Sequence, residues 1–213
     1  MPTLLLRLQA PMQSWGISSH FTSRDTTREP TKSGVIGLIC AALGRPRDAD
    51  ISDLAELKMG VRVDREGILQ KDFHVAQDIM LAIGKGTKDT EISDRYYLSD
   101  AVFLVGLEGR LVLLEEIQSA LKSPYWTLYL GRKAFPPGKP IWLQEGLRDE
   151  LLLDALQGFP SLVSDPAESL RVVLESETGE FVRADVPISF AERRFSSRRI
   201  HMGHIASPGY QEV

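Results

Sequence analysis

Leu4-Leu5-Leu6-Arg7-Leu8 and Lys32-Ser33-Gly34-Val35-Ile36-Gly37-Leu38-Ile39 are the two runs that decide the fold. The first run predicts a strand over residues 3–8, because an apolar run that ends at Pro and Gly is typical of a buried strand. The second predicts a helix that Ser33 caps and that ends at Leu43, before Gly44 and Pro46. Together, across the polar loop between them, the strand and the helix form the first β–α step of the predicted fold.

The residues that follow extend this unit. Residues 57–63 and 101–107 are rich in β-branched or aromatic side chains and predict two further strands. Residues 111–121 carry Leu and Ile on one helical stripe and predict a second helix, and residues 140–143 predict a last strand. The order βαββαβ predicts an α+β fold, a ferredoxin-like (RRM-like) domain over residues 1–143, whose sheet is a common RNA-binding surface.

The segment over residues 66–100 is too long to be a simple turn between two strands. It contains strand-like patches around a Gly84-Lys85-Gly86 turn. The sequence therefore predicts a projecting β-hairpin, here called the thumb, and the aromatic and histidine content of its strands favours a function. Residues 144–213 predict a small C-terminal β-rich subdomain packed beside the first domain, of undetermined topology.

Composition limits the class of protein. With 213 residues, 43% of them hydrophobic, the chain can bury a substantial core. Its only cysteine, Cys40, lies in an apolar helix and predicts an inert thiol in a cytoplasmic protein. The longest apolar stretch is about half of the ~20 residues that span a membrane, so we expect no membrane segment.

Charge is unevenly distributed. The formal net charge of -4 argues against indiscriminate nucleic-acid binding. However, cations cluster in residues 1–47, 122–139 and 193–199, and acidic side chains gather in residues 145–185. This segregation favours one polyanion-binding face and one face turned to solvent or to a basic protein, although clustering by chance stays open.

Two loops combine cations with groups that bind nucleic acid. Arg24, Arg28, Lys32 and the Ser33 hydroxyl lead into a helix N-terminus, which favours a phosphate. An ordinary surface loop would look the same. In the second loop, over residues 128–133, a glycine would allow close approach of a ligand, a tyrosine could stack on a base, and two cations follow.

Three histidines and one tryptophan carry groups that could serve other chemistry. His74 could contact RNA or act as a general base, and the lack of a nearby nucleophile favours an RNA contact. His201 and His204 lack further ligands close in the sequence, so we expect neither a metal nor a cofactor. Trp15 follows a strand, and a core position is favoured over base stacking.

Several short motifs, taken in chain order, resemble a known family. They are Met12-Gln13-Ser14-Trp15-Gly16, Pro30-Thr31-Lys32-Ser33-Gly34, Leu128-Tyr129-Leu130-Gly131-Arg132-Lys133 and Phe195-Ser196-Ser197-Arg198. Together they resemble the CasD family of the RAMP superfamily, whose members bind the 5′ handle of the CRISPR RNA (crRNA) in type I-E Cascade complexes. The resemblance covers nearly the whole chain.

The resemblance implies a non-catalytic subunit that holds the crRNA handle and uses the thumb to grip it. It also implies contacts with the CasC backbone subunits and the CasA large subunit, and with target DNA only through the complex. The candidate RNA-binding residues are Gln13, Arg24, Arg28, Lys32, Ser33, His74, Tyr129, Arg132, Lys133, Arg194 and Arg198.

Two other functions remain open at this point. Related RAMP proteins cut precursor crRNA without a metal, and Lys71, His74, Tyr96 and Tyr97 make a metal-independent endoribonuclease conceivable. A generic single-strand RNA-binding module is the third possibility, and the negative net charge weakens it.

Overall fold

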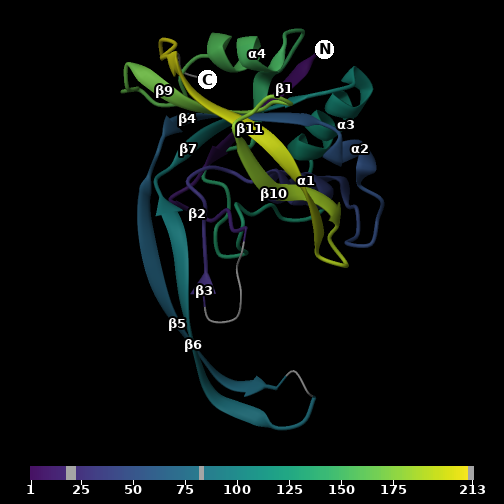
Figure 1. Cartoon of the computed structure of the whole chain (residues 1–213), viewed down its shortest axis with the longest axis vertical. Helices are drawn as coiled ribbons and strands as arrows, with labels where there is room; N and C mark the ends of the chain where they lie inside the picture. The colour runs from purple at the N-terminus through teal and green to yellow at the C-terminus, as the bar shows by residue number, and fades with distance from the viewer. Residues whose placement is uncertain (18–22, 82–83, 211–213) are drawn as a thin grey trace.

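A computed structural model describes residues 1–17, 23–81 and 84–210 of the chain (Figure 1). Its main sheet has seven strands in the order β10-β11-β9-β4-β7-β1-β8. Their bounds are β1 (Thr3–Gln9), β4 (Lys58–Arg65), β7 (Val102–Glu108), β8 (Trp142–Arg148), β9 (Ser169–Glu175), β10 (Phe181–Ser189) and β11 (Arg194–Ala206). The protein is therefore a mixed α+β protein, as predicted.

Helices cover both faces of this sheet. They are α1 (Lys32–Leu43), α2 (Ser52–Ala55), α3 (Leu111–Lys122) and α4 (Leu152–Gly158). The strands predicted at residues 3–8, 57–63 and 101–107 and the helices predicted at 33–43 and 111–121 are all present, with ends shifted by a few residues. The strand predicted at 140–143 begins at Trp142 and continues to Arg148.

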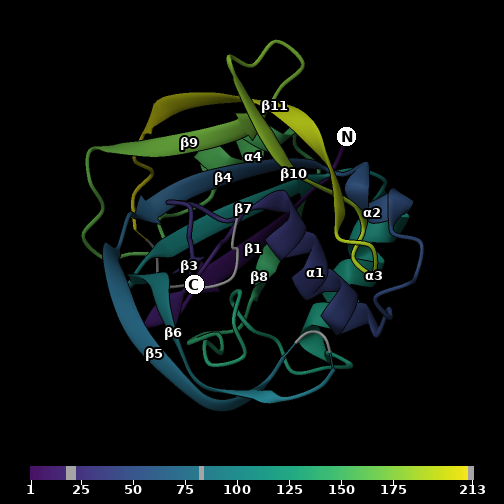
Figure 2. The same ribbon diagram turned by 60° about the horizontal axis from the view of Figure 1, so that its bottom comes forward.

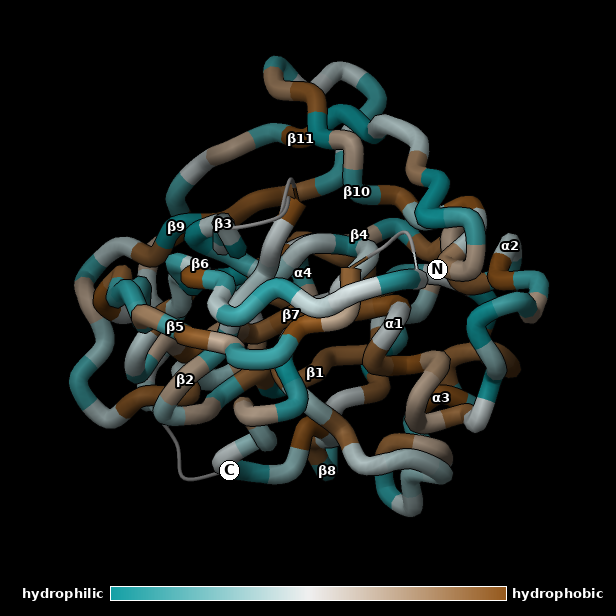
Figure 3. Tube along the Cα trace, turned by 90° about the horizontal axis from the view of Figure 1, so that it is seen from below, coloured by the Kyte–Doolittle hydropathy of each residue, from teal (hydrophilic) through white to brown (hydrophobic). Residues whose placement is uncertain are grey.

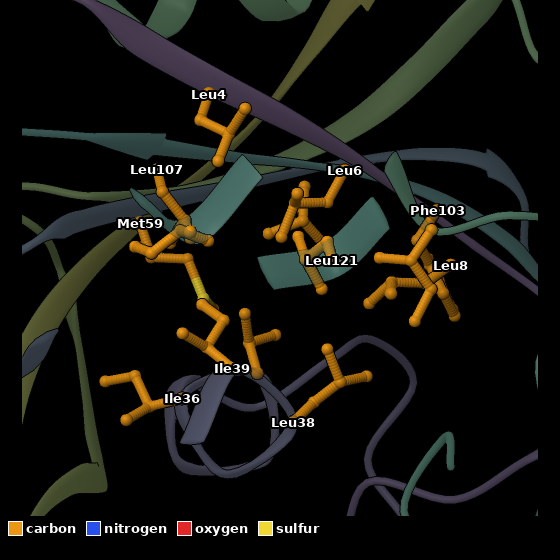
Figure 4. Packing of buried hydrophobic residues seen from close by; sticks show 14 of the residues in the cluster. Leu4, Leu6, Leu8, Ile36, Leu38, Ile39, Met59, Phe103, Leu107 and Leu121 are labelled. Atoms are coloured by element: carbon orange, nitrogen blue, oxygen red, sulfur yellow. The ribbon is translucent and has the colours of Figure 1, made fainter. Parts of the chain in front are cut away.

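The run of leucines in β1 is explained by burial on both sides. Leu4, Leu6 and Leu8 belong to the larger core cluster with α1 and α3, whereas Leu5 belongs to a second cluster with α4. Figure 4 shows the first cluster closing between the sheet and α1, and Figure 3 colours β1 and α1 largely as apolar. Successive side chains point to opposite faces of a strand, so a strand that is covered on both faces has no polar alternation.

The ends of α1 are set by two different residues. Thr31, and not the predicted Ser33, is the N-cap: its side-chain oxygen accepts a hydrogen bond of 3.3 Å from the Gly34 N–H. Gly44 ends the helix with φ +73°, as expected for a C-terminal glycine. Burial raises the pKa of the Cys40 thiol within this helix to about 11, which agrees with an inert cysteine.

The predicted thumb hairpin is present. β5 (Ile68–Met80) and β6 (Thr87–Ser99) pair antiparallel from Ile68↔Ser99 to Met80↔Thr87. β6 also pairs with β2 (Met12–Gln13) and, in parallel, with β3 (Ser23–Arg24). The hairpin projects from the side of the body away from α4 and curves beneath it (Figures 1 and 2). Residues 82 and 83, just before the predicted Gly84-Lys85-Gly86 turn, lie outside the described part.

The C-terminal strands correct one expectation. β9 pairs with β4, and β11 with β9, so these strands extend the first sheet instead of packing beside it. The division placed at 143/144 falls inside β8. The reason is long-range pairing, which no local pattern in residues 144–213 encodes. Within the described ranges, no helix is long and apolar enough to cross a membrane.

Candidate nucleic-acid interface

Two of the motifs singled out in the sequence contact each other at the base of the hairpin. The Ser14 N–H donates to the Leu130 carbonyl oxygen at 3.1 Å. Gly131 has φ +93°, and a β-carbon there would lie 1.7 Å from the Ser14 carbonyl oxygen. The close approach that Gly131 permits is therefore to the chain's own backbone, and its interpretation as space for a ligand is wrong.

Arg132 fixes this loop against the hairpin. Its Nη2 donates to the Tyr96 carbonyl oxygen at 2.8 Å and to the Arg24 carbonyl oxygen at 3.3 Å. Its guanidinium lies 5.5 Å from the centre of the Phe135 ring, and the Tyr97 ring packs against Phe135 at 5.8 Å. Arg132 thus joins three segments that are distant in the sequence.

Three guanidinium groups gather at this place, and we call Arg24, Arg95 and Arg132 the cationic cluster. Arg24 and Arg95 are register partners in the β3–β6 pair. Burial lowers the pKa of Arg132, and the charges of Arg95 and Arg24 lower it further, more than Asp72 and Asp25 raise it. Two guanidinium charges that lower the pKa of a third mark a local excess of positive charge, which an anion would relieve.

Arg95 was missed by sequence reasoning. It lies inside a strand of the hairpin, and the parallel pairing that brings it to Arg24 joins residues about seventy positions apart. A charged side chain in an exposed hairpin strand carries no local signal for binding. Lys133, which was predicted, is exposed next to Arg132 in the chain.

Lys32 does not contact solvent, contrary to the prediction. It is 1% exposed, and its Nζ lies 3.0 Å from both carboxylate oxygens of Glu175. Its backbone N–H donates to Asp185 at 2.8 Å. The anion at the N-terminus of α1 is therefore the chain's own Asp185, and the predicted phosphate site is already filled.

Arg198 is also buried, and its prediction as an RNA contact is wrong. Its Nε and Nη2 donate to Asp185 at 2.7 and 2.9 Å, and its Nη1 donates to Glu175 at 3.2 Å. Burial alone would raise the pKa of Asp185, but the hydrogen bonds and charge of Arg198, together with the Lys32 N–H, hold that pKa below its usual range. These four side chains connect α1 to β9, β10 and β11.

Gln13 is a third residue whose predicted role is wrong. Its side-chain amide is fully buried, with Nε2 donating to the Ala101 carbonyl oxygen at 2.7 Å and Oε1 accepting from the Trp15 indole at 3.1 Å. Trp15 itself is 1% exposed, which confirms its expected core position. Both groups of the amide are satisfied inside the protein, as buried polar groups must be.

The remaining candidates are accessible but not gathered at one place. Arg28 is exposed and lines a hollow with Arg171 and Arg183, whereas Arg194 lies near Glu192, with 3.4 Å between Nε and Oε2. Ser33 and Tyr129 line a different hollow, along α1. Of the predicted cations that remain accessible, the structure brings together Arg24 and Arg132, and Lys133 follows Arg132 in the chain.

His74 lies on the hairpin, with Nε2 2.9 Å from Oδ2 of Asp72. In the β5–β6 register Gln70 faces Tyr97 and Lys71 faces Tyr96. Since alternate residues share a face, His74 lies on the face of Tyr97, and Lys71 on the face of Tyr96. The four residues considered for an endoribonuclease are therefore divided between the two faces of the ribbon. Among described residues, no group of three or more His, Cys, Asp or Glu side chains could hold a metal ion.

The chain is similar to CRISPR-associated proteins. The family model described as CRISPR-associated protein (Cas_Cas5) matches residues 3–205. The Cascade subunit CasD of Escherichia coli strain K12 is 32% identical over an alignment of 217 positions, which covers 92% of this chain and 92% of that one.

Two solved structures have the same fold. A crystal structure of a Cas protein matches with a TM-score of 0.82 and 46% identity, over 97% of this chain and 98% of that one. A chain of a CRISPR RNA-guided surveillance complex matches with a TM-score of 0.81 and 34% identity, over 97% of this chain and 91% of that one. A model that matches almost the whole chain, with a relative above 30% identity, shows the family: this chain belongs to the Cas5 family of CRISPR-associated proteins.

Proposed function

We propose that this chain is a non-catalytic RNA-binding subunit of a Cascade-type CRISPR surveillance complex, and that it holds the 5′ handle of the crRNA. Its relative in E. coli is a Cascade subunit, and one similar structure is a chain of an RNA-guided complex. The observation that carries the proposal is the cationic cluster at the base of the hairpin. A polyanion is the ligand that relieves such a concentration of positive charge.

The hairpin lies beside the cationic cluster and contributes one of its arginines. Arg95 is on β6 and Arg24 on β3, so RNA phosphates at the cluster would lie where the hairpin leaves the body. Arg95 shares a hairpin face with Asp72 and His74, since Asp72 faces Arg95 in the register. This face, with the cluster at its base, is the one that we assign to RNA.

The architecture behind the cluster also fits the family. The adjacent strands β8-β1-β7-β4, with α1 after β1 and α3 after β7, have the strand order and connections of a ferredoxin-like unit. We propose that this unit is the RNA-binding platform, and that CasC-type and CasA-type subunits contact other parts of the chain in a cytoplasmic complex.

We assign no catalytic role. Cleavage without a metal needs an acid–base pair positioned around one phosphate. Lys71 and Tyr96 lie on one ribbon face and His74 and Tyr97 on the other, so the four side chains do not surround one phosphate. The carboxylate of Asp72 beside His74 fits an orienting or charge-balancing contact.

The proposal is tested by the salt dependence of crRNA binding. We expect Arg24→Ala and Arg95→Ala each to weaken binding, and each to reduce the log–log slope of affinity against salt by about one unit. Arg110→Ala is the matched control, because it removes an equal charge from an exposed position. Arg110 follows the C-terminal end of β7, whereas the hairpin joins the N-terminal end of that strand. An unchanged slope in the Arg24→Ala/Arg95→Ala double variant would show that the cluster does not bind phosphates.

A further inference from the structure

A hollow of about 500 Å³ runs along the outward side of α1, and we call it the α1 groove. Its lining residues come from α1 and the loop after it, from the loop between α3 and β8, and from the turn between β10 and β11. It shares Ser33, Gly34, Gly131 and Phe190 with a smaller hollow that reaches Ser14 and Gly16. The groove therefore leads from the end of α1 towards the loop that carries Arg132.

The floor of the groove is formed by residues of α1 that have small side chains or none. Gly34, Gly37 and Ala41 share one side of α1, because residues three and four apart are neighbours on a helix surface. Gly34 is required by the fold, since a β-carbon there would lie 2.8 Å from the Trp15 ring. At Gly37 the nearest atom to an added β-carbon is the Phe190 ring at 3.6 Å, which is an ordinary contact. Packing does not explain the glycine at 37, and its absence of a side chain keeps the groove open.

The walls of the groove are aromatic. Tyr129 and Phe190 are half-buried, and Trp126 is 60% exposed. The backbone of Trp126 is fixed, because its backbone N–H donates to the Ala41 carbonyl oxygen at 3.1 Å. Its ring makes an edge contact with the Tyr125 ring, with 5.1 Å between the ring centroids. The N–H of Tyr125 donates to the Ala42 carbonyl oxygen at 2.9 Å. An indole held in place but left exposed offers a face for stacking at little entropic cost.

The charges around the groove favour an anionic occupant. Of the described residues that line it, none is acidic, and Arg45 and Arg47 lie at one end. Arg45 is paired with Asp53 at 2.6 and 2.7 Å. Arg47 donates to the Phe190 carbonyl oxygen at 3.0 Å and forms no ion pair with a described residue. Arg132 adjoins Gly131 at the other end.

We propose that the α1 groove receives unpaired bases of the crRNA, stacked against Trp126, Tyr129 and Phe190, with the adjoining phosphates near Arg47 and the cationic cluster. This inference rests on the proposed function, and it adds the class of ligand group that the groove binds. Single-stranded RNA combines flat apolar bases with negative charge, and the groove combines aromatic walls with cationic ends. An apolar protein segment would match the walls but would leave the charge of Arg47 without a counter-ion.

The test uses a variant that fills the groove. Gly37→Leu places a side chain over the floor, while Gly37→Ala adds a methyl group that the structure accommodates and serves as the control. We expect Gly37→Leu to weaken binding of fluorescein-labelled crRNA roughly tenfold or more, because stacking on each base is lost, and to lower the salt slope by no more than the phosphate contact at Arg47. Its melting temperature should not fall, since leucine favours a helix more than glycine does. Trp126→Ala should weaken binding similarly from a position that is mostly exposed.

A fluorescent base separates stacking from phosphate binding. With 2-aminopurine in the handle of the crRNA, wild-type protein should quench its emission, and Gly37→Leu and Trp126→Ala should not. Wild-type affinity in both variants would overturn the inference while the effect of Arg24→Ala and Arg95→Ala still supports the proposed function. Normal crRNA binding combined with failed assembly with the other Cascade subunits would assign the groove to a protein segment instead. If the wild-type chain binds no crRNA, the proposed function fails first.

Discussion

The α-carbon of Gly131 faces the carbonyl oxygen of Ser14 so closely that an added β-carbon would lie 1.7 Å from that oxygen. This contact links the Met-Gln-Ser-Trp-Gly and Leu-Tyr-Leu-Gly-Arg-Lys motifs, which are more than a hundred residues apart. It places the Arg132 guanidinium where it can reach the Arg24 and Tyr96 carbonyl oxygens. The two motifs are therefore parts of one structural joint beneath the cationic cluster.

Gly131→Ala should destabilise the protein by about 3 kcal/mol or more, because the added methyl group clashes with backbone and φ +93° is strained for alanine. The free energy of unfolding in urea measures this. Gly209→Ala is the control, since nothing lies within 4 Å of its added β-carbon. A Gly131→Ala variant as stable as Gly209→Ala would mean that the Ser14 loop moves away freely.

The sequence was sufficient for the parts of the fold that local pattern encodes. Apolar runs, glycine and proline gave the strands and helices around β1, and the length of the 66–100 segment gave the hairpin. Local sequence pattern failed where a side chain contacts residues that are distant in the chain. Lys32 and Arg198 have the same local pattern whether their anion is a phosphate or Asp185, and only the β9–β11 pairing brings that carboxylate to α1.

Lys32→Met should separate stability from binding. It leaves Glu175 and Arg198 in the buried network with one cation fewer, and breaking a buried ion pair in this way costs about 3–5 kcal/mol. We expect a lower melting temperature but a wild-type salt slope for crRNA binding. A reduced salt slope with unchanged stability would show that Lys32 contacts the RNA.

Acid should weaken the same network through Asp185. Its pKa is lower in the folded chain than in the unfolded chain, so its contribution to stability is present above its ordinary pKa of about 3.9 and is lost as pH falls through the folded value. Asp185→Asn should lower stability at neutral pH and flatten the loss in this acid range. Urea titrations of both proteins between neutral and strongly acidic pH measure the difference, and parallel pH curves would contradict the assignment.

The absence of catalysis is directly measurable. Purified protein incubated with labelled precursor crRNA should leave it intact, with or without a divalent metal, because His74 and Lys71 lie on opposite faces of the hairpin. His74→Ala should then alter only affinity. Specific cleavage by the wild-type protein that His74→Ala abolishes would replace the binding role with an endoribonuclease.

Shortening the hairpin distinguishes its contribution to stability from its contribution to RNA binding. The strand pairs beyond His74↔Ser93 are mostly exposed, whereas Arg95 pairs with β3 and Leu98 is buried in the core. Replacing residues 75–92 with a short Gly/Ser turn should therefore leave the melting temperature near that of the wild-type protein, since little buried surface is lost.

Retention of crRNA by the assembled complex should nevertheless fall, because the shortened hairpin no longer encloses a strand held at the cationic cluster. The salt slope should stay close to wild type, since Arg24, Arg95 and Arg132 remain in place. Normal crRNA content in complexes built with this variant would refute the gripping role. A large drop in melting temperature would show instead that the outer hairpin stabilises the body.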